Sequence, residues 1–382
     1  MLPIRRAAPV ARYSLAASKA EGVDVRVAYL VPWRGGRSTG PYKKIAAQVR
    51  TWAARGVDAA LFVATSGEAV DDWRDLAFDG IVLSTDGASP LAKTRERRSL
   101  VETLLEWGPD VVYERHGLWA PALTTMSRRV PTVIEINGND IREFAVHSRR
   151  KHLYNLATRN ANLRRAKGLA HVTNDLAALR SYARFGLPNV VIGNGVDLAS
   201  LPELPAARAV RPRLVWLGDP RSPFHSIDDL MALAAARPMW DVDVVGPPPR
   251  TAADRQLINL HWHPGGPAEA YLPVLAAADV GIGTLNAYRT GMKEASALKV
   301  REYLGCGLAT VIGYRDTDFP DPVDHVLEVP NEPFGIMRTL DALDGFVRRW
   351  QGRRVPRSEV GHLDVRVKEE RRLEFLERLT HR

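Results

Sequence analysis

The sequence predicts an α/β protein with two Rossmann-like domains, each built on a parallel β-sheet, and three observations support this. The chain has 382 residues, more than a single hydrophobic core usually organises. Short apolar runs of strand length alternate with helical patterns along most of the chain, as in successive β-α-β units. Near the middle, Leu198–Pro212 is rich in Pro, Ala and Arg, which is typical of a linker.

We expect the chain to divide into five parts. They are a poorly ordered leader at 1–23, an N-terminal domain at 24–197, the linker at 198–212, a C-terminal domain at 213–355, and a helical segment at 356–382. The leader has no apolar core of the kind found in signal peptides.

The first domain is expected to contain a series of buried strands and intervening helices. The strands are Val25–Val31, Ala59–Ala64, Gly80–Leu83, one beginning at Asp110, Pro131–Ile136 and Gly168–Thr173, and the helices are Tyr42–Ala54, Lys93–Trp107 and Asp175–Phe185.

A glycine-rich loop, Pro32–Pro41, joins the first strand to the first helix. Glycine lets the backbone approach a ligand closely, so this loop is a candidate binding segment, and a plain surface turn is the alternative. The loop lacks the spacing G-x-G-x-x-G, which disfavours dinucleotide binding.

Two polar residues follow strands of this domain. His116 comes after the strand that begins at Asp110, and Asn137 comes after Pro131–Ile136. Parallel α/β sheets bind ligands beyond the carboxyl ends of their strands, so both residues are candidates for a site in a cleft between the domains. For His116, a structural role is about equally expected.

The second domain opens with a strand, Arg213–Leu217, and its organising unit is Ala278–Gly313. This unit is expected to contain a strand at Val280–Leu285, a helix at Ala297–Leu304 and a strand at Leu308–Ile312. Ser296 is the expected N-cap of the helix. Further helices are expected at Phe334–Gln351 and Val365–Leu379.

The start of the helix after Ser296 is suited to binding a phosphate, because unpaired backbone N–H groups and the positive end of the helix dipole lie there. Two carboxylates, Glu294 and Glu302, frame it in the pattern E-x7-E, and Lys299 adds a cation. The alternative is an ordinary solvated helix with two surface glutamates.

The run Glu294–Leu308, EASALKVREYLGCGL, resembles the donor-site signature of the retaining group 1 (family 4) glycosyltransferases, which have the two-domain GT-B fold. The resemblance implies that Glu302 binds the ribose of a sugar nucleotide and Glu294 the donor sugar. It also implies that backbone N–H groups of Ala297, Leu298 and Lys299 meet the diphosphate. The loop Pro32–Pro41 and the run Asn194–Asp197 (NGVD) also resemble segments of this family, and the resemblance places Gly40 near the donor sugar and phosphate. It further implies that 24–197 is the acceptor domain, that 213–355 is the nucleotide-sugar donor domain, and that the helix in 356–382 packs back toward the first domain.

The chain departs from the family pattern at several positions. After Gly218, where the family usually supplies an Arg and a Lys to the diphosphate, this chain has Asp219, and His225 stands at the apparent position of the Lys. Arg221 is the expected replacement cation. Asn137 stands where the family commonly has a His that contacts the donor sugar.

Composition limits the remaining choices. Residues 1–200 carry a net charge of +10 and residues 201–382 carry −1, which favours an anionic or lipid-linked acceptor, or a membrane surface, over nucleic acid. The basic stretch Arg142–Arg184 is either a solvated helix face or a membrane-docking surface. A single cysteine, Cys306, fits a reducing compartment, so we expect a cytoplasmic protein. The membrane-docking alternative for the basic stretch would place it at the inner face of the membrane.

No cofactor and no metal are expected, because the sequence has no metal-ligand spacing and a nucleoside diphosphate sugar would serve as substrate. Asp241-Val242-Asp243 resembles a D-x-D metal motif, but strand alternation explains it better.

The expected function is retaining transfer of a sugar to an acceptor hydroxyl, in glycolipid, polysaccharide or cell-envelope synthesis. A sugar-nucleotide epimerase of the same fold, or a non-enzymatic sugar-nucleotide-binding subunit, remains the alternative.

Overall fold

The computed structural model of the protein describes residues 25–65, 69–76, 78, 80–85, 90–220, 225, 227–247 and 257–380. By packing, the chain separates into two compact units. The first unit comprises residues up to Glu135, Ala157–Leu169 and the residues from Leu373 onward. The second comprises Ile136–Leu156 and Ala170–Arg372.

The first sheet has seven strands in the order β3-β2-β1-β4-β5-β6-β7. Its strands are β1 (Val27–Pro32), β2 (Ala59–Thr65), β3 (Ile81–Thr85), β4 (Val111–Arg115), β5 (Thr132–Ile136), β6 (Gly168–His171) and β7 (Asn189–Val191). Neighbouring strands β1 to β5 pair in parallel. Because their side chains are buried on both faces, these strands are nearly continuous apolar runs, as the sequence predicts.

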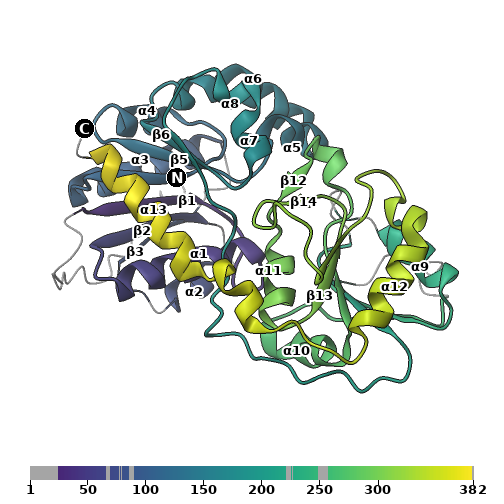
Figure 1. Ribbon diagram of the computed structural model, residues 1–382. Helices are drawn as coiled ribbons and strands as arrows, with labels where there is room; N and C mark the ends of the chain where they lie inside the picture. The colour runs from purple at the N-terminus through teal and green to yellow at the C-terminus, as the bar shows by residue number, and fades with distance from the viewer. Residues whose placement is uncertain are drawn as a thin grey trace, which may run out of the picture. The chain divides into compact units, whose positions relative to one another are not determined.

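Helices connect these strands (Figure 1). They are α1 (Gly40–Ala54), α2 (Ala69–Arg74), α3 (Pro90–Trp107), α4 (Pro121–Ser127), α5 (Asp140–His147), α6 (Arg149–Leu163), α7 (Asn174–Ala178) and α8 (Arg180–Ala183). The sequence did not predict α2 or α4, because helices of six and seven residues are too short for helical periodicity to be read. The single helix expected at Asp175–Phe185 is instead two short helices, because Leu179 has an extended ψ of 123°.

The second sheet has six strands in the order β10-β9-β8-β11-β13-β15. They are β8 (Arg213–Leu217), β9 (Asp241–Val245), β10 (Leu260–His263), β11 (Val280–Ile282), β13 (Ala309–Ile312) and β15 (Val326–Glu328), and all adjacent pairs are parallel. Two short strands, β12 (Glu294–Ala295) and β14 (Arg315–Asp316), form a separate pair.

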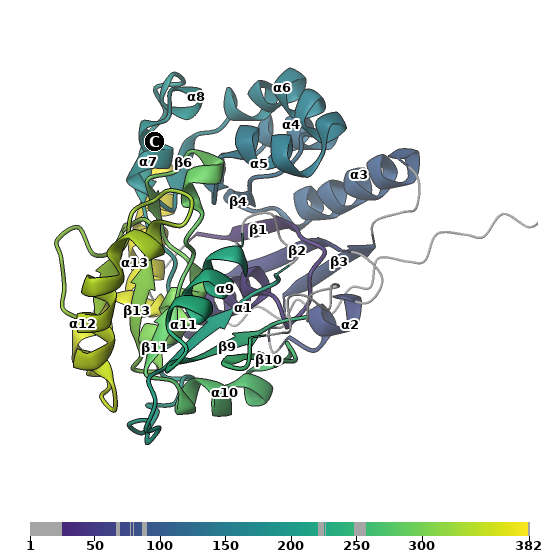
Figure 2. The ribbon, with the colours of Figure 1, turned by 90° about the vertical axis from the view of Figure 1, so that its right-hand side faces the viewer.

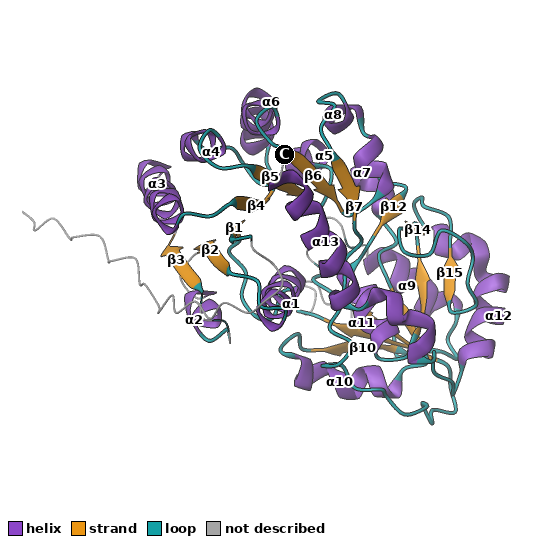
Figure 3. Cartoon of the chain, turned by 60° about the vertical axis from the view of Figure 1, so that its left-hand side comes forward, coloured by secondary structure: helices purple, strands orange, loops and turns teal. Residues whose placement is uncertain are grey.

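The helices α9 (Ile227–Ala236), α10 (Ala268–Ala277), α11 (Leu298–Gly305) and α12 (Leu340–Trp350) accompany this sheet (Figure 3). The last helix, α13 (Val365–Thr380), contributes its residues from Leu373 onward to the first unit, where Phe375 and Leu379 lie beside Gly168 of β6. A 3₁₀ turn, Gly335–Thr339, occupies the start of the helix expected at Phe334–Gln351. Helix α11 packs against β11 and β13 (Figures 1 and 2).

The fold class predicted from the sequence is confirmed: the chain is α/β, with two parallel, Rossmann-like sheets. The single cysteine, Cys306, is fully buried where α11 ends and packs among apolar side chains. None of the helices in the described ranges is both long enough and apolar enough to cross a membrane.

Candidate functional site

The start of helix α11 is built differently from the sequence prediction. Ala297, with φ −75° and ψ 128°, is the N-cap, and no side chain caps the helix. Ser296, the expected cap, is buried and turned away: its Oγ accepts a hydrogen bond from the Asn194 N–H at 2.7 Å and one from Arg301 Nη2 at 2.8 Å. The Ser296 prediction was therefore wrong, because tertiary partners compete successfully for its hydroxyl.

The consequence is an uncapped helix start, which we call the α11 tip (Ala297–Lys299). The first backbone N–H groups that donate within the helix are those of Val300 and Arg301, which bond the Ala297 carbonyl at 3.0 and 3.3 Å. Among the described residues, the N–H groups of Leu298 and Lys299 have no acceptor. Two N–H groups and the positive end of the helix dipole are thus available to an anion.

The opposite face of α11 is fixed by Arg301, whose side chain is fully buried. Its guanidinium donates to both carboxylate oxygens of Asp316, at 2.7 and 2.8 Å, to Asp318 at 2.8 Å and to the Asn194 carbonyl at 3.0 Å. Burial alone would lower the pKa of Arg301, but Asp316 and Asp318 raise it above its usual value. This network fixes the direction of α11, since bidentate ion pairs have narrow geometry.

Arg301 is a site residue that the sequence alone does not identify. Its only sequence signal is a charged residue flanked by the buried Val300 and Tyr303, with two aspartates just beyond the next strand.

Glu294 lies in the two-residue strand β12, and it is buried. Its Oε2 accepts hydrogen bonds from Asn174 N at 2.8 Å and from Asn174 Nδ2 at 3.2 Å. Asp175 Oδ2 in turn accepts from the backbone N–H groups of Lys293 and Glu294 at 2.6 and 2.8 Å. The Glu294 carboxylate is therefore held in one orientation by α7, and within the described chain its Oε1 takes no hydrogen bond.

Glu302 stands one turn inside α11 and is half-buried. The hydroxyl of Tyr271, from α10, donates a short hydrogen bond to Glu302 Oε1. Burial of Tyr271, followed by the charge of Glu302, raises the pKa of the tyrosine, so its hydroxyl remains a donor at all ordinary pH values. The second carboxylate of the E-x7-E pair is thus oriented as well.

Lys299 points its Nζ toward the face of Trp216, 4.2 Å from the ring centroid. The Nζ atom is buried, although the side chain as a whole is half-buried, and it has no hydrogen-bond acceptor among the described residues. Burial lowers the pKa of Lys299 to about 7. A cation–π contact compensates only part of the lost hydration of an ammonium group.

His225 packs edge-on against the same Trp216 ring, with the centroids 5.2 Å apart. Burial, and then the charge of Lys299, lower the pKa of His225 to about 3, so the imidazole is neutral at physiological pH. Its Nδ1 lies 3.0 Å from the Asp219 carbonyl, which can only accept, so Nδ1 carries the proton and Nε2 is an acceptor. His225 in this state offers no cation to a phosphate.

Gly218 follows β8 at the carboxyl edge of the second sheet. A Cβ atom there would lie 2.6 Å from the Trp216 ring, so only glycine fits. The other expected cation of this loop, Arg221, lies outside the described residues.

The first unit contains Gly40 and His116. Gly40 is the first residue of α1, and Thr39 is the N-cap. The His116 N–H donates to the Glu135 carbonyl at 2.9 Å. The Glu135 side chain is buried and accepts from Lys44 Nζ at 2.7 Å, so a buried ion pair lies close to the backbone of His116. Asn137 is the first residue after β5 and is half-buried in the second unit.

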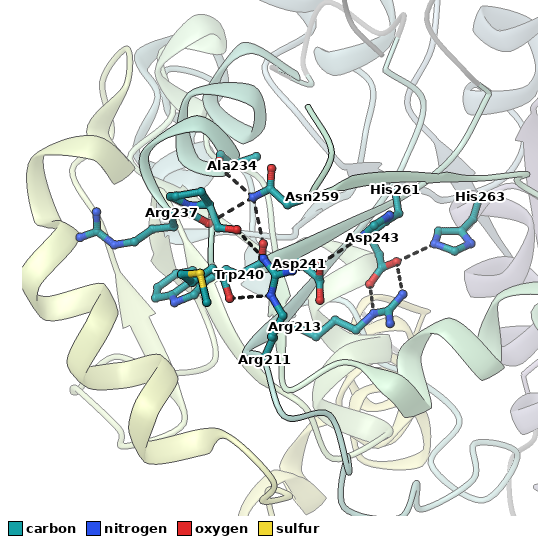
Figure 4. Close-up of polar contacts among 12 residues, drawn as sticks. Arg211, Arg213, Ala234, Arg237, Trp240, Asp241, Asp243, Asn259, His261 and His263 are labelled. Carbon is teal, nitrogen blue, oxygen red and sulfur yellow. Dashed lines mark hydrogen bonds and ion pairs between the residues drawn. The ribbon is translucent and has the colours of Figure 1, made fainter. Parts of the chain in front are cut away.

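The pair Asp241 and Asp243 lies on strand β9, as predicted, and both side chains have partners (Figure 4). Asp243 is fully buried; its Oδ1 accepts from Arg213 Nη2 at 2.8 Å and from His263 Nε2 at 2.6 Å. Asp241 accepts from His261 Nε2 at 3.1 Å. These contacts link β8, β9 and β10, so both carboxylates stabilise the sheet.

The second unit also contains a cavity of about 540 Å³. It is lined by Leu198, Ala199, Arg357, Gly361, Asp364, Arg366 and Val367. None of the candidate residues lines it, and its charged groups already pair within the chain, so we assign the site to the α11 tip instead.

Comparison with known proteins supports the fold. Residues 39–200, which include Gly40, His116 and Asn137, match the model of Glycosyltransferase Family 4. No curated protein matches the chain.

Solved structures with this fold cover nearly the whole chain. Sucrose-phosphate synthase from Thermosynechococcus elongatus is 14% identical, with a TM-score of 0.64 over 93% of this chain and 96% of that one. Anabaena HepE in complex with UDP and glucose is 14% identical, with a TM-score of 0.60 over 92% and 95%. The UDP-GlcNAc 2-epimerase of Neisseria meningitidis is 12% identical, with a TM-score of 0.53 over 92% and 100%. The chain therefore has the GT-B fold throughout, and its part from residue 39 to 200 matches glycosyltransferase family 4.

Proposed function

We propose that this protein is a retaining glycosyltransferase that moves a sugar from a nucleoside diphosphate sugar to an acceptor hydroxyl. The observation that carries the proposal is the uncapped α11 tip between two oriented carboxylates, Glu294 and Glu302. The family match and the GT-B neighbours, one of them bound to UDP and glucose, support the same assignment.

The parts of a sugar nucleotide correspond to the parts of this site. The diphosphate takes the N–H groups of Leu298 and Lys299, where charge develops on the β-phosphate as the glycosidic bond breaks. Glu302 accepts from the ribose hydroxyls, and Glu294 accepts from hydroxyls of the donor sugar through its open Oε1. No metal or other cofactor takes part.

The two glutamates act as binding groups. Each accepts a hydrogen bond from a fixed protein donor, Asn174 or Tyr271, which suits a carboxylate that orients hydroxyl groups. Orientation of the donor against the acceptor hydroxyl supplies much of the rate enhancement. Gly40 and His116, which belong to the first unit, serve the acceptor or the donor sugar in this proposal, and Asn137, which belongs to the second unit, takes the position of the family's histidine.

Thermal-shift screening against UDP-glucose, ADP-glucose and GDP-mannose tests the proposal. We expect one sugar nucleotide to raise the Tm of the wild type, and we expect Glu302→Ala to lose most of that shift. Glu269→Ala, which removes an exposed carboxylate from α10, is the matched control and should keep the shift. Equal shifts in wild type and Glu302→Ala would contradict the site assignment.

The epimerase alternative rests on the fold shared with the UDP-GlcNAc 2-epimerase. Incubating the protein with its sugar nucleotide and no acceptor separates the two activities. Epimerised free nucleotide favours the epimerase, whereas unchanged nucleotide that is consumed only when an acceptor is added favours the transferase. Binding without turnover under both conditions favours a non-enzymatic subunit.

We further propose that the segment Val146–Leu156, at the junction of α5 and α6, docks on an anionic membrane surface that carries the acceptor. Four large apolar side chains are exposed there: Val146 at 45%, Leu153 at 57%, Tyr154 at 42% and Leu156 at 44%. The exposed basic residues Arg149, Arg150 and Lys151 lie among them. Apolar insertion and attraction to anionic headgroups then act together.

Vesicle sedimentation tests the docking surface. Vesicles containing phosphatidylglycerol should bind the protein, pure phosphatidylcholine should not, and salt should release it. Leu153→Ser should weaken binding, whereas Met239→Ser, at an exposed residue outside this segment, should not. Equal binding to both vesicle types would overturn the docking proposal.

A further inference from the structure

Lys299 is the one cation in this site for which the described chain supplies no partner. Its Nζ is buried against Trp216 and lacks any hydrogen-bond acceptor or carboxylate within ion-pair distance among the described residues. Other buried cations of the second unit are paired: Arg301 with Asp316, and Lys368 with Asp318. An ammonium group left in this way invites an anion from outside the chain.

The surroundings of Lys299 favour its neutral form when no ligand is bound. The backbone of Lys299 lies at the positive end of the α11 dipole, which disfavours a second positive charge. His225, from the loop after β8, shares the Trp216 ring with Lys299 and is neutral, so it does not stabilise an ammonium group. On α11 itself, the nearest carboxylate in sequence, Glu302, accepts from Tyr271. Burial with no compensating charge lowers the pKa of Lys299 to about 7.

We propose that Lys299 of α11 supplies the diphosphate-binding cation in place of the neutral His225, and that the amine of Lys299 takes up one proton when the diphosphate binds. This inference rests on the proposed function. The reaction is a proton transfer from solvent or buffer to the amine, coupled to an ion pair between the ammonium and a phosphate oxygen. The tip then offers two N–H groups and one charge, whereas His225 acts only as packing beside Trp216.

The geometry explains why the protonation of a lysine in this position changes when a ligand binds. In the free protein the amine is tolerated over an aromatic ring at low cost, because it carries no charge to desolvate. A bound diphosphate provides the missing negative charge and shifts the equilibrium to the ammonium form. Binding is then strongest below the pKa of the free protein and weakens as pH rises above it.

Titration calorimetry of UDP-glucose, or of whichever sugar nucleotide gives the thermal shift, measures this uptake directly. The diphosphate of a sugar nucleotide is a diester and does not titrate near neutral pH, so protons counted in buffers of different ionisation enthalpy come from the protein. We expect close to one proton taken up per ligand at about pH 8 and little uptake at about pH 6. Wild-type affinity should fall as much as tenfold per pH unit between these values.

Two variants at the same position separate charge from position. Lys299→Arg stays charged at every accessible pH, so it should bind with no proton uptake and with affinity independent of pH. Lys299→Met should bind at least tenfold more weakly at about pH 6 and also take up no proton.

The outcomes distinguish this inference from the function it rests on. Wild-type binding at about pH 8 without proton uptake, or uptake that persists in Lys299→Arg, overturns the role of Lys299 and leaves the glycosyltransferase proposal in place. Failure of every sugar nucleotide to bind the wild type at about pH 6 overturns both.

Discussion

Lys299 and Arg301 are two residues apart on α11 and lie on opposite faces of it, since two residues turn an α-helix through about 200°. Arg301 faces the interior and is paired with Asp316, Asp318 and the Asn194 carbonyl. Lys299 faces Trp216 and has only an aromatic ring. One face of the helix carries a completed electrostatic network, and the other carries an incomplete one.

The two faces have different roles: the paired Arg301 stabilises the structure, whereas Lys299, unpaired within the described chain, is suited to binding a ligand. A buried charge with all its partners in place holds a structure in one arrangement, whereas a buried charge without partners makes folding less favourable unless a ligand completes it. The Arg301 face fixes where the α11 tip points, and the Lys299 face determines what the tip can hold. Substitutions on each face test this division, and they should change stability in opposite directions.

Arg301→Met should have the largest effect. Removing the guanidinium leaves Asp316 buried without its cation, and breaking a buried pair in this way costs about 3–5 kcal/mol. The free energy of unfolding from urea titration measures it. Arg353→Met, which changes an exposed arginine of the same unit, is the control and should stay within about 0.5 kcal/mol of wild type. A loss at Arg301 as small as the control would show that the face is not a completed network.

Lys299→Met should stabilise the free protein at acidic and neutral pH. Because the folded pKa of about 7 lies below the unfolded value of about 10.4, folding must bury a charge below pH 7. Between these two values the unfolded state binds more protons, so wild-type stability rises with pH and the advantage of the methionine variant disappears. Urea titrations at about pH 6, 8 and 10 measure the trend; destabilisation at pH 6 would mean that Lys299 has a partner in the fold.

Ser296→Ala should cost about 1–3 kcal/mol, because the buried Asn194 N–H and one N–H of Arg301 lose their acceptor. Ser200→Ala, at an exposed serine, is the control. A double-mutant cycle with Arg301→Met should show that the two losses are coupled, since both belong to one network. Additive effects would place Ser296 outside it.

Tyr271→Phe should have the smallest effect on stability, about 1 kcal/mol, because Glu302 is half-buried and water can replace the lost hydroxyl. The effect on sugar-nucleotide binding should be larger than the effect on stability, since the Glu302 carboxylate loses the hydroxyl that orients it for the proposed ribose contact. Calorimetric affinity compared with urea stability checks this, and an unchanged affinity would argue against orientation by Tyr271.

The sequence by itself determined the fold class and the position of most elements in both sheets. Short apolar runs such as Val27–Pro32 and Ala309–Ile312 are suited to strands buried on both faces of a parallel sheet, so local pattern and tertiary structure agree. The β-α-β unit around α11 was readable for the same reason, and so was Asp241–Val245 as a strand. The short helices α2 and α4, the ten-residue helices α9 and α10, and the break at Leu179 were not predicted.

The tertiary structure decided the chemistry of the site. Ser296 is a residue type that often caps helices, but its hydroxyl instead accepts hydrogen bonds from Asn194, which is distant in sequence, and from Arg301, which is near. His225 and Lys299 have the residue types of cations, but burial next to Trp216 lowers the pKa of each. Charge state and hydrogen-bond partners depend on which side chains the fold places around a group, and residue type fixes neither of them.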